Sequence, residues 1–349
     1  MSGGWAAKDF CEAGVKTLVL ERGRHVEHGE DYIGENKDPW NMKFRDKVDQ
    51  KLADDRYPRQ KRCYAFKDST KHFFVDDIEH PYSTEKGNNF EWIRGNQLGG
   101  RSLLWHRQSY RWSDMDFSSN ARDGYGTDWP VRYKDMKPWY DYVEEFVGVS
   151  GTLEGMEQLP DGIFLPPIGF NCAEEEFGRR IGNTYNDRRL IPGRCAHLTE
   201  PKPIHTDLGR GTCQSRNQCQ RGCSLGAYFS SQSATLPAAK RTGNLTIITD
   251  SIVDSIIYDP KNKKAIGVRV IDSRTNITTT YNAKVIFLCA STLGTTQILL
   301  NSKSEHFKTG FANRSDAVGR YLMDHLALTG ARGELDAFQD KYYIGRKPN

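Results

Sequence analysis

The sequence predicts an α/β fold, and three observations lead to that prediction. Short β-rich runs alternate with helical stretches along the 349 residues, as in proteins that pack helices on a sheet. A helix is followed by a strand at the N-terminus, and a buried strand runs directly into a helix near residue 290. Hydrophobic residues make up 37% and charged residues 27% of the chain, which fits a globular protein of two domains or one large domain.

The elements follow in order from local patterns. Residues 3–13 predict a helix that Gly14 closes, because glycine suits the left-handed end of a helix. Residues 15–21 predict a strand that ends in an acid, and residues 25–90 predict a long polar loop region. The remaining predicted elements are a glycine-bearing turn at 93–112, helices at 133–147 and 233–241, strands at 245–249, 252–258 and 265–271, a buried strand at 283–288 and a helix at 291–301. Within the helix at 133–147, Trp139, Tyr142 and Phe146 recur at a spacing of three and four, which predicts one face packed on the core.

Composition excludes several classes of protein. No apolar run approaches the roughly 18 residues that would span a bilayer, and the first ten residues, MSGGWAAKDF, do not show a signal-peptide pattern. The net charge of +4, without a block of lysine and arginine, argues against nucleic-acid binding. Five of the eight cysteines are scattered, which predicts a role in core packing for Cys11, Cys63, Cys172, Cys195 and Cys289.

The first 21 residues match the second half of a dinucleotide-binding βαβ unit. Gly3 would let backbone amides approach a pyrophosphate, and the helix start would add partial positive charge. Glu21, 18 residues later, would accept hydrogen bonds from an adenosine ribose that carries no 2′-phosphate. The first strand and the earlier glycines of this fingerprint would precede Met1. An ordinary helix–strand pair with a solvated glutamate stays open as an alternative.

Five segments, in the same order as in the family, resemble the glucose–methanol–choline (GMC) family of FAD-dependent oxidoreductases. The resemblance is closest to its pyranose-oxidase and sugar-dehydrogenase branch. The segments are GGWAAK with LERG (3–23), RGNQLGGRSLLW (94–105), WPV, WY and VSG (129–151), CASTLGTTQILLNS (289–302) and VGRYLMDH (318–325). They cover nearly the whole chain.

The resemblance implies a Rossmann-like FAD-binding domain with an α+β substrate-binding domain that is incomplete here. The implied parts are a first FAD-binding part at 1–120, a cap or substrate-side insertion at 121–200, a second FAD-binding part at 201–310 and the start of the substrate-binding domain at 311–349. The implied cofactor contacts are Gly3, Glu21, Arg22, Gly95, Leu98, Gly99, Gly100, Ser102, Leu103, Leu104, Trp105, Val253, Ala290, Ser291, Asp324 and His325.

Departures from the family pattern carry expectations of their own. Leu104 stands where flavinylated relatives have the histidine that bonds to the flavin, which predicts non-covalent FAD. Arg101 replaces a usual small residue and Thr296 a usual proline. The catalytic histidine and its His or Asn partner would lie beyond Asn349, so the catalytic residues are unknown and the chain is expected to be a fragment at both ends.

Three cysteines, Cys213, Cys219 and Cys223, lie close together in one loop. Thiolates favour iron–sulfur clusters or zinc. The spacing resembles that of multi-subunit sugar dehydrogenases of the family, which carry a three-iron cluster. A disulfide with one free thiol, or three reduced buried thiols, are the alternatives.

The resulting expectation is an FAD-dependent oxidoreductase acting on the CH–OH group of a sugar or polyol, with hydride passing to the flavin. An electron-transfer partner such as a cytochrome subunit is possible within the resemblance, and both cytoplasm and periplasm stay open. Two alternatives remain: a truncated FAD-fold fragment without catalytic activity, and an NAD-dependent dehydrogenase. The GNQLGG and CASTLGTTQ segments weigh against the second, because a simple nicotinamide fold needs neither.

Overall fold

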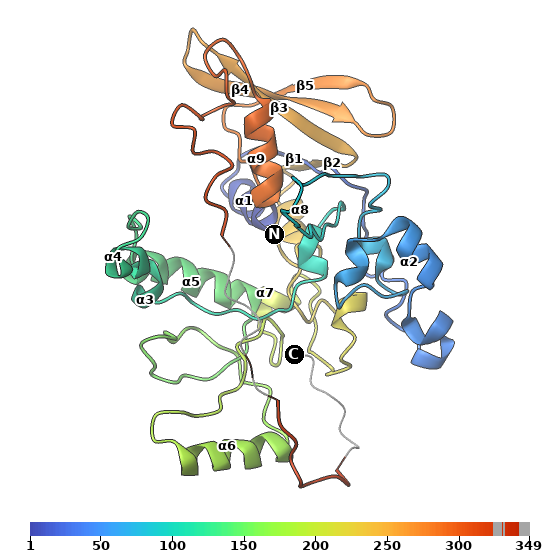
Figure 1. Cartoon of the computed structure of the whole chain (residues 1–349), viewed down its shortest axis with the longest axis vertical. Helices are drawn as coiled ribbons and strands as arrows, with labels where there is room; N and C mark the ends of the chain where they lie inside the picture. The colour runs from blue at the N-terminus through green and yellow to red at the C-terminus, as the bar shows by residue number, and fades with distance from the viewer. Residues whose placement is uncertain (324–329, 331, 342–349) are drawn as a thin grey trace. The chain divides into compact units, whose positions relative to one another are not determined.

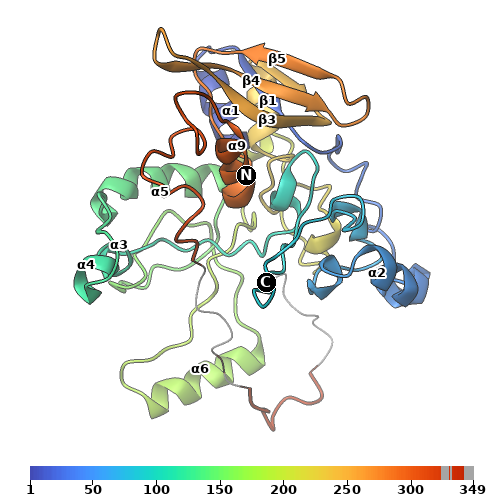
Figure 2. The same ribbon diagram turned by 45° about the horizontal axis from the view of Figure 1, so that its top comes forward.

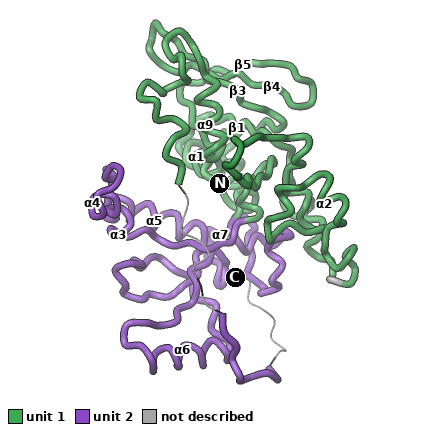
Figure 3. The backbone as a smooth tube through the Cα atoms, viewed as in Figure 1, with its two compact units in different colours: residues 1–104, 230–330 green, residues 105–229, 331–349 purple. Residues whose placement is uncertain are grey.

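The computed structural model describes residues 1–323, 330 and 332–341, and the chain divides into two compact units (Figure 3). Unit 1 consists of residues 1–104 and 230–330, and unit 2 of residues 105–229 and 331–349. The 105–229 part of unit 2 is therefore an insertion in the sequence of unit 1: the chain leaves unit 1 after Leu104 and re-enters it at Ser230.

Unit 1 is the α/β part of the protein and holds all five strands of the described residues (Figure 1). Its helices and strands are α1 (Ser2–Glu12), β1 (Thr17–Leu20), α2 (Gln50–Arg56), α8 (Thr235–Arg241), β2 (Leu245–Ile248), β3 (Ser251–Asp259), β4 (Lys264–Asp272), β5 (Thr278–Asn282) and α9 (Ser291–Asn301). Its 3-10 turns are η1 (Pro39–Asn41), η2 (Lys43–Asp46), η3 (Gln60–Arg62), η4 (Lys71–Phe73) and η5 (Gly100–Leu103). The predicted α/β class is confirmed, and the predicted helices and strands at 3–21 and 233–271 are present with ends shifted by one or two residues.

The first sheet is a parallel pair of β1 and β2, in which Thr17 lies opposite Leu245 and Leu20 opposite Ile248. Helices α1 and α8 lie beside this pair (Figure 1). Ala7 and Cys11 of α1 and Ala239 of α8 are buried together, with Val19 and Leu245 of the two strands packed against them. Small side chains at these positions allow the two helices to approach each other closely.

The second sheet is antiparallel, in the order β3-β4-β5, and α9 lies against β3 (Figure 2). The Ile256 N–H of β3 donates to Ser302 Oγ just after α9, at 2.8 Å. Tyr258 of β3 packs edge-on against Phe307, at 4.9 Å between ring centroids. These contacts fix the end of α9, and hence its direction, relative to the sheet.

The predicted buried strand at 283–288 is wrong. This segment has no strand conformation, and Val285 and Phe287 are 68% and 60% exposed. A continuous apolar run predicts a strand buried on both faces, but a strand also needs hydrogen-bonding neighbours. Among the described residues the β1–β2 sheet has two strands only. The segment instead contacts α1, where Phe10 and Phe287 meet edge-on at 4.9 Å.

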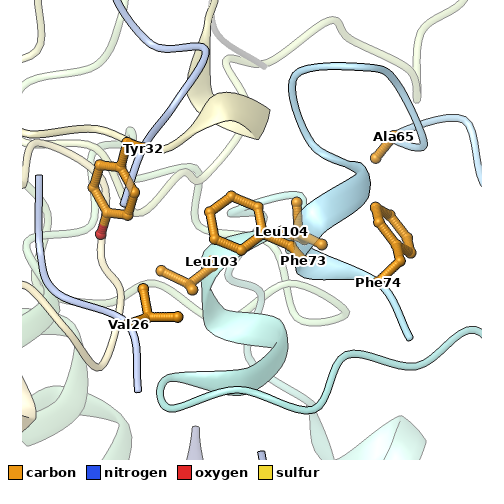
Figure 4. Close-up of a cluster of buried hydrophobic side chains, with 7 residues drawn as sticks. All are labelled: Val26, Tyr32, Ala65, Phe73, Phe74, Leu103 and Leu104. Carbon is orange, nitrogen blue, oxygen red and sulfur yellow. The ribbon is translucent and has the colours of Figure 1, made fainter. Parts of the chain in front are cut away.

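The loop region 25–104 has an apolar core of its own (Figure 4). Its buried members are Val26, Tyr32, Ala65, Phe73, Phe74, Leu103 and Leu104. Residues distant in sequence thus share one cluster, which explains how a stretch with little regular secondary structure holds a defined path.

Unit 2 is built of helices and irregular segments, and in its described residues β-pairing is limited to isolated bridges. Its helices are α3 (Asp114–Phe117), α4 (Ser119–Asp123), α5 (Tyr133–Val147), α6 (Cys172–Thr184), α7 (Pro203–Thr206) and the 3-10 turn η6 (Cys219–Arg221). Helix α5 has the predicted bounds. The prediction that its aromatic face is buried is wrong for Trp139, which is 63% exposed, because only the last turn of the helix packs inward, through Glu144, Phe146 and Val147.

A buried ion-pair network holds α5 in unit 2. Arg111 donates from Nε to one oxygen of Glu144 at 2.8 Å and from Nη2 to the other at 2.5 Å. Asp141 accepts a further bond from Nη2, and the Ile163 N–H donates to Glu144. The charge of this fully covered arginine is therefore balanced by two carboxylates of one helix.

The cysteines differ in environment from what was expected. All eight are free thiols. Core packing is confirmed for Cys11 and Cys195, whereas Cys172, the first residue of α6, is exposed. No helix in the described part of the chain is long and apolar enough to cross a membrane.

Candidate functional site

Three segments of unit 1 meet at the start of α1. This helix begins immediately after Met1, and burial lowers the pKa of the Met1 ammonium while the nearby Cys289 and Glu21 raise it. A Cβ on Gly3 would stand 3.3 Å from the Cβ of Cys289, two residues before α9. The starts of two helices and the carboxyl end of β1 are thus neighbours. Helix starts present backbone N–H groups, and in α/β folds nucleotides bind at the carboxyl ends of the strands, so this place suits a phosphate-bearing ligand.

Gly4 is the position at which α1 comes closest to another element. A Cβ there would lie 2.4 Å from Thr235 Oγ1 and 2.9 Å from Ser231 Oγ. Both hydroxyls are buried without a hydrogen-bond partner among the described residues. The sequence singles out Gly3 for close backbone approach. The structure adds Gly4, whose missing side chain is required for packing against the segment that leads into α8.

Glu21 follows β1 and is partly buried. The Gly23 N–H donates to its Oε1 at 2.8 Å. Burial raises the pKa of the Glu21 carboxyl, and the Gly23 N–H, the Met1 ammonium and Arg22 act against that increase. Arg22 itself is exposed. A half-buried carboxylate held by a backbone N–H is a suitable acceptor for ribose hydroxyls, as predicted for Glu21.

The glycine-rich loop lies beside the segment that follows β1. The Leu98 N–H donates to the Arg24 carbonyl at 2.9 Å, and Arg24 forms a parallel bridge with Gln97. A Cβ on Gly23 would stand 1.8 Å from the Asn96 carbonyl oxygen, so no other residue fits there. Residues from two motifs of the sequence, around 21–24 and 94–100, are therefore in direct contact.

The glycines of this loop are needed for its path. Gly99 and Gly100 both adopt positive φ, 91° and 50°. Gly99 also lies against Gln232, whose carbon Cγ would be 2.9 Å from an added Cβ. A Cβ on Gly95 would stand 2.5 Å from the Phe73 carbonyl oxygen. Neighbouring segments of the chain thus pack directly against the backbone of Gly95 and Gly99. The predicted contact of these glycines with a cofactor stays a prediction.

Several of the predicted cofactor contacts have side chains that are buried in the core. Leu98, Leu103 and Leu104 are 4%, 1% and 2% exposed. Ser102 is fully buried and its Oγ accepts from the Ser231 N–H at 3.0 Å. These buried side chains hold the glycine-rich loop and the segment before α8 in place. They present no exposed surface that a cofactor could contact, so their role is to position the backbone of the loop.

The start of α9 carries two more predicted contacts. Ala290 is its N-cap residue and Ser291, with φ 65°, is its first residue. Ala290 and Ser291 are both exposed. The structure therefore brings these two residues to the same place as Gly3 and Glu21, through Cys289.

The structure does not bring the remaining predicted residues to this place. Trp105 belongs to unit 2, where its Nε1 donates to the Phe229 carbonyl at 2.8 Å. Val253 lies on β3 in the antiparallel sheet of unit 1. Asp324 and His325 lie outside the described residues.

The three clustered cysteines line one pocket in unit 2. Cys213, Cys219 and Cys223 line one pocket together with residues 214–218. Backbone bonds hold both ends of this loop: the Cys213 N–H donates to the Leu198 carbonyl at 2.7 Å, and the Gly226 N–H to the Cys223 carbonyl at 2.9 Å. Three sulfur donors from one short loop thus face a common space.

Burial keeps the thiols of Cys213 and Cys219 protonated when nothing is bound. It raises the pKa of Cys213 and raises that of Cys219 to about 11. As the side chains stand, no three His, Cys, Asp or Glu residues of the described chain are placed around a single metal ion. The pocket therefore supplies thiol donors around a cavity and not a closed mononuclear site.

Two buried residues near the cysteines were not predicted from the sequence. His197, fully buried, places Nε2 3.9 Å from Cys219 Sγ, and its Nδ1 has no partner among the described residues. Arg210 is 2% exposed and donates to the carbonyls of Phe146, Val147 and Gly226. His197 precedes Cys219 by 22 residues, so no local pattern in the sequence connects them.

Comparison with known proteins finds similarity to one enzyme family. The GMC oxidoreductase family model matches residues 183–327. The chain is 29% identical over 237 residues to 2-methyl-1,2-propanediol dehydrogenase of Mycolicibacterium austroafricanum, covering 66% of this chain and 41% of that protein. It is 28% identical over 233 residues to the fructose dehydrogenase large subunit of Gluconobacter japonicus, covering 65% and 41%.

Longer but weaker similarity extends over most of the chain. The oxygen-dependent choline dehydrogenase of Pseudomonas syringae pv. syringae (strain B728a) is 26% identical over 341 residues, covering 93% of this chain and 50% of that protein. Among solved structures, pyridoxine 4-oxidase from Mesorbium loti aligns over 86% of this chain and 49% of that one, with 18% identity and a TM-score of 0.48. The chain spans half or less of the length of these relatives. The family model and these relatives agree, and the chain is similar to GMC oxidoreductases over residues 183–327.

Proposed function

We propose that this chain carries the FAD-binding part of an oxidoreductase that acts on the CH–OH group of a sugar or a related alcohol. One observation supports it above the others: the start of α1, Glu21 and the start of α9 are neighbours in unit 1. Members of the GMC family use FAD, and the relatives named above are dehydrogenases of alcohols by their names.

The residues of this place fit a dinucleotide. Gly3 and Ser291 open two helices whose first N–H groups can bind phosphate oxygens. Glu21, held by the Gly23 N–H, would accept from ribose hydroxyls. The absence of a histidine at Leu104, which is packed in the core, supports non-covalent binding.

When bound, FAD supplies a hydride acceptor for the alcohol carbon. The chain's own part is to bind and orient the cofactor: Gly23 and the 94–100 loop hold the segment after β1, and Glu21 fixes the adenosine end. No residue of the described chain is assigned as the base that takes the hydroxyl proton.

The test is FAD binding by the purified chain, measured as the change in flavin fluorescence on titration. Glu21→Ala is expected to weaken binding, because hydrogen bonds to a charged group contribute about 1.5–3 kcal/mol, or roughly 10- to 150-fold in Kd. Glu157→Ala, an exposed carboxylate of unit 2, is the matched control and is expected to leave the Kd unchanged. Acid precipitation is expected to release all the flavin into the supernatant. Tight binding of NAD in place of FAD would contradict the proposal.

The substrate class is tested separately, by anaerobic bleaching of bound flavin with fructose, a 1,2-diol and choline. Reduction by a polyol or sugar supports the substrate part of the proposal. A flavin that binds but is reduced by none of the three would leave FAD binding standing and refute that part.

We also propose that Cys213, Cys219 and Cys223 hold an iron–sulfur cluster that takes electrons from the flavin. Support comes from the shared pocket, from the preference of thiolates for such clusters, and from the similarity to a fructose dehydrogenase large subunit, whose name implies a further subunit. A cytochrome subunit is the proposed kind of partner.

Because burial raises the pKa of two of these thiols, cluster assembly must release protons and is expected to become more favourable as pH rises. Anaerobic reconstitution with iron and sulfide, followed by iron and sulfide analysis, tests the cluster. Cys213→Ser is expected to abolish it and Cys172→Ser, at the exposed start of α6, to leave it intact. Equal iron content in both variants would refute the assignment.

A further inference from the structure

We infer that His197 donates a hydrogen bond from Nε2 to the sulfur of Cys219 and thereby sets the redox potential of the centre in this pocket. The inference rests on the proposed iron–sulfur cluster and goes beyond it, because it names a residue that is not a ligand. In the structure Nε2 lies 3.9 Å from Cys219 Sγ, within the range of hydrogen bonds to sulfur.

The backbone of His197 is held next to the cysteine loop. The His197 N–H donates to the Cys195 carbonyl at 2.8 Å, and residue 197 forms an antiparallel bridge with Tyr228. The next residue, Leu198, donates to the Ala227 carbonyl and accepts from Cys213. The segment that carries the histidine is thus bound directly to the cysteine loop, which holds the backbone of residue 197 beside that loop. The ring itself is fully buried, so the packing around it restricts its rotation.

The tautomer follows from the surroundings of the ring. A neutral imidazole carries one N–H, at Nδ1 or at Nε2. Among the described residues Nδ1 has no partner, whereas Nε2 faces the sulfur of Cys219. Burying an N–H without an acceptor costs free energy. The proton therefore belongs on Nε2, where a thiolate sulfur accepts it.

The charge around the loop also favours electron-rich sulfur. Arg210 is buried, and its three donor nitrogens meet only carbonyl oxygens. It forms no ion pair with a carboxylate among the described residues, and Cys223 is the neighbouring group whose negative charge would balance it. A centre with net negative charge on its sulfurs would provide that balance.

Hydrogen bonds to the sulfurs help to set the potential of an iron–sulfur cluster. A donor stabilises the reduced state more, because that state has more negative charge on sulfur. Removing the donor is therefore expected to lower the midpoint potential and to make the cluster harder to reduce.

The experiment compares reconstituted wild-type protein with three variants by EPR-monitored redox titration. His197→Leu is expected to titrate at a lower potential, and His197→Gln, whose amide can donate, to lie nearer the wild type. His205→Gln is the matched control: His205 is equally buried in the same unit, but its ring nitrogens bind backbone groups of Lys202 and Glu145. Its potential is expected to match the wild type.

The outcomes separate the inference from the proposal beneath it. Wild-type protein that takes up no iron overturns both. Iron uptake with the same potential in His197→Leu and wild type overturns the role of His197 alone. If His197→Leu does not fold, wild-type protein labelled with ¹⁵N-histidine decides by pulsed EPR: a coupled imidazole nitrogen with an exchangeable proton supports the hydrogen bond, and no such coupling refutes it.

Discussion

Gly4 of α1 offers a direct test of the packing that holds the candidate site together. The proposed change is Gly4→Ala, which places a Cβ 2.4 Å from Thr235 Oγ1 and 2.9 Å from Ser231 Oγ. Both atoms belong to buried side chains at the start of α8. To admit the methyl group, these buried hydroxyls must turn away or α1 must shift.

The size of the effect follows from two opposing contributions. Alanine in place of glycine within a helix is favourable by about 0.5–1 kcal/mol. Forcing an extra methyl group into a packed core costs about 1–3 kcal/mol. Gly182→Ala in α6 isolates the first contribution, because an added Cβ there meets no atom within 4 Å. The difference between the two variants is therefore expected to equal the cost of the clash, about 1–3 kcal/mol.

Urea unfolding followed by circular dichroism measures both variants against the wild type. Gly182→Ala is expected to be slightly stabilised and Gly4→Ala destabilised. Adding Thr235→Ala to Gly4→Ala is expected to recover part of the loss, because it removes the nearer of the two atoms. If Gly4→Ala proves as stable as Gly182→Ala, the close contact between α1 and the start of α8 is wrong.

Three further predictions concern charge and thiol reactivity. Arg111→Met leaves the buried Glu144 without its cation, while Asp141 keeps Lys137, and is expected to cost about 3–5 kcal/mol in urea unfolding. The exposed Arg122→Met is expected to leave the stability unchanged, and equal losses in the two variants would refute the burial argument. Because burial raises the pKa of Glu21 above its ordinary 4.5, the folded wild type loses stability as pH rises through that raised value. Glu21→Gln does not undergo this loss, so melting temperatures at pH 4.5 and 7.5 are expected to show a gain for the variant at the higher pH only, and a pH-independent difference would contradict it. Cys172 is exposed and is expected to react first with a thiol reagent at pH 8, whereas burial raises the pKa of Cys195 to about 11 and should protect it until unfolding; mass spectrometry of partly labelled protein checks the order.

Local patterns were sufficient for the elements whose signals are local. The helix at 133–147 and the strands around 252–271 follow from periodicity and turn residues within their own length, and the structure has them there. The segment at 283–288 has the same kind of signal, but strand formation depends on a neighbouring strand that periodicity does not report. Similarly, the spacing from Gly3 to Glu21 anticipated their proximity, because one helix–turn–strand unit joins them.

The parts of the sites that depend on distant residues were not predictable in this way. Ser231 and Gln232 contact α1 and the glycine-rich loop, although residues 105–229 separate them from those elements in the sequence. A buried serine or glutamine carries no recognisable sequence signal. His197 and Arg210 approach the cysteine loop through backbone bonds of the 195–198 and 225–229 segments. Their positions depend on the path of unit 2 and not on any motif.

The parallel pairing of β1 with β2 has a consequence for biosynthesis. The two strands are neighbours in the sheet, but Leu20 pairs with Ile248 and the whole of unit 2 up to residue 229 is translated between them. At about 5–20 residues per second, β1 emerges from the ribosome roughly 10–45 seconds before its partner exists. During that time α1 and β1 have neither α8 nor β2 to cover their apolar sides. The nascent protein must therefore protect β1 while residues 105–229 of unit 2 are being made, and the β1–β2 pair cannot form until the chain has been synthesised past Ile248.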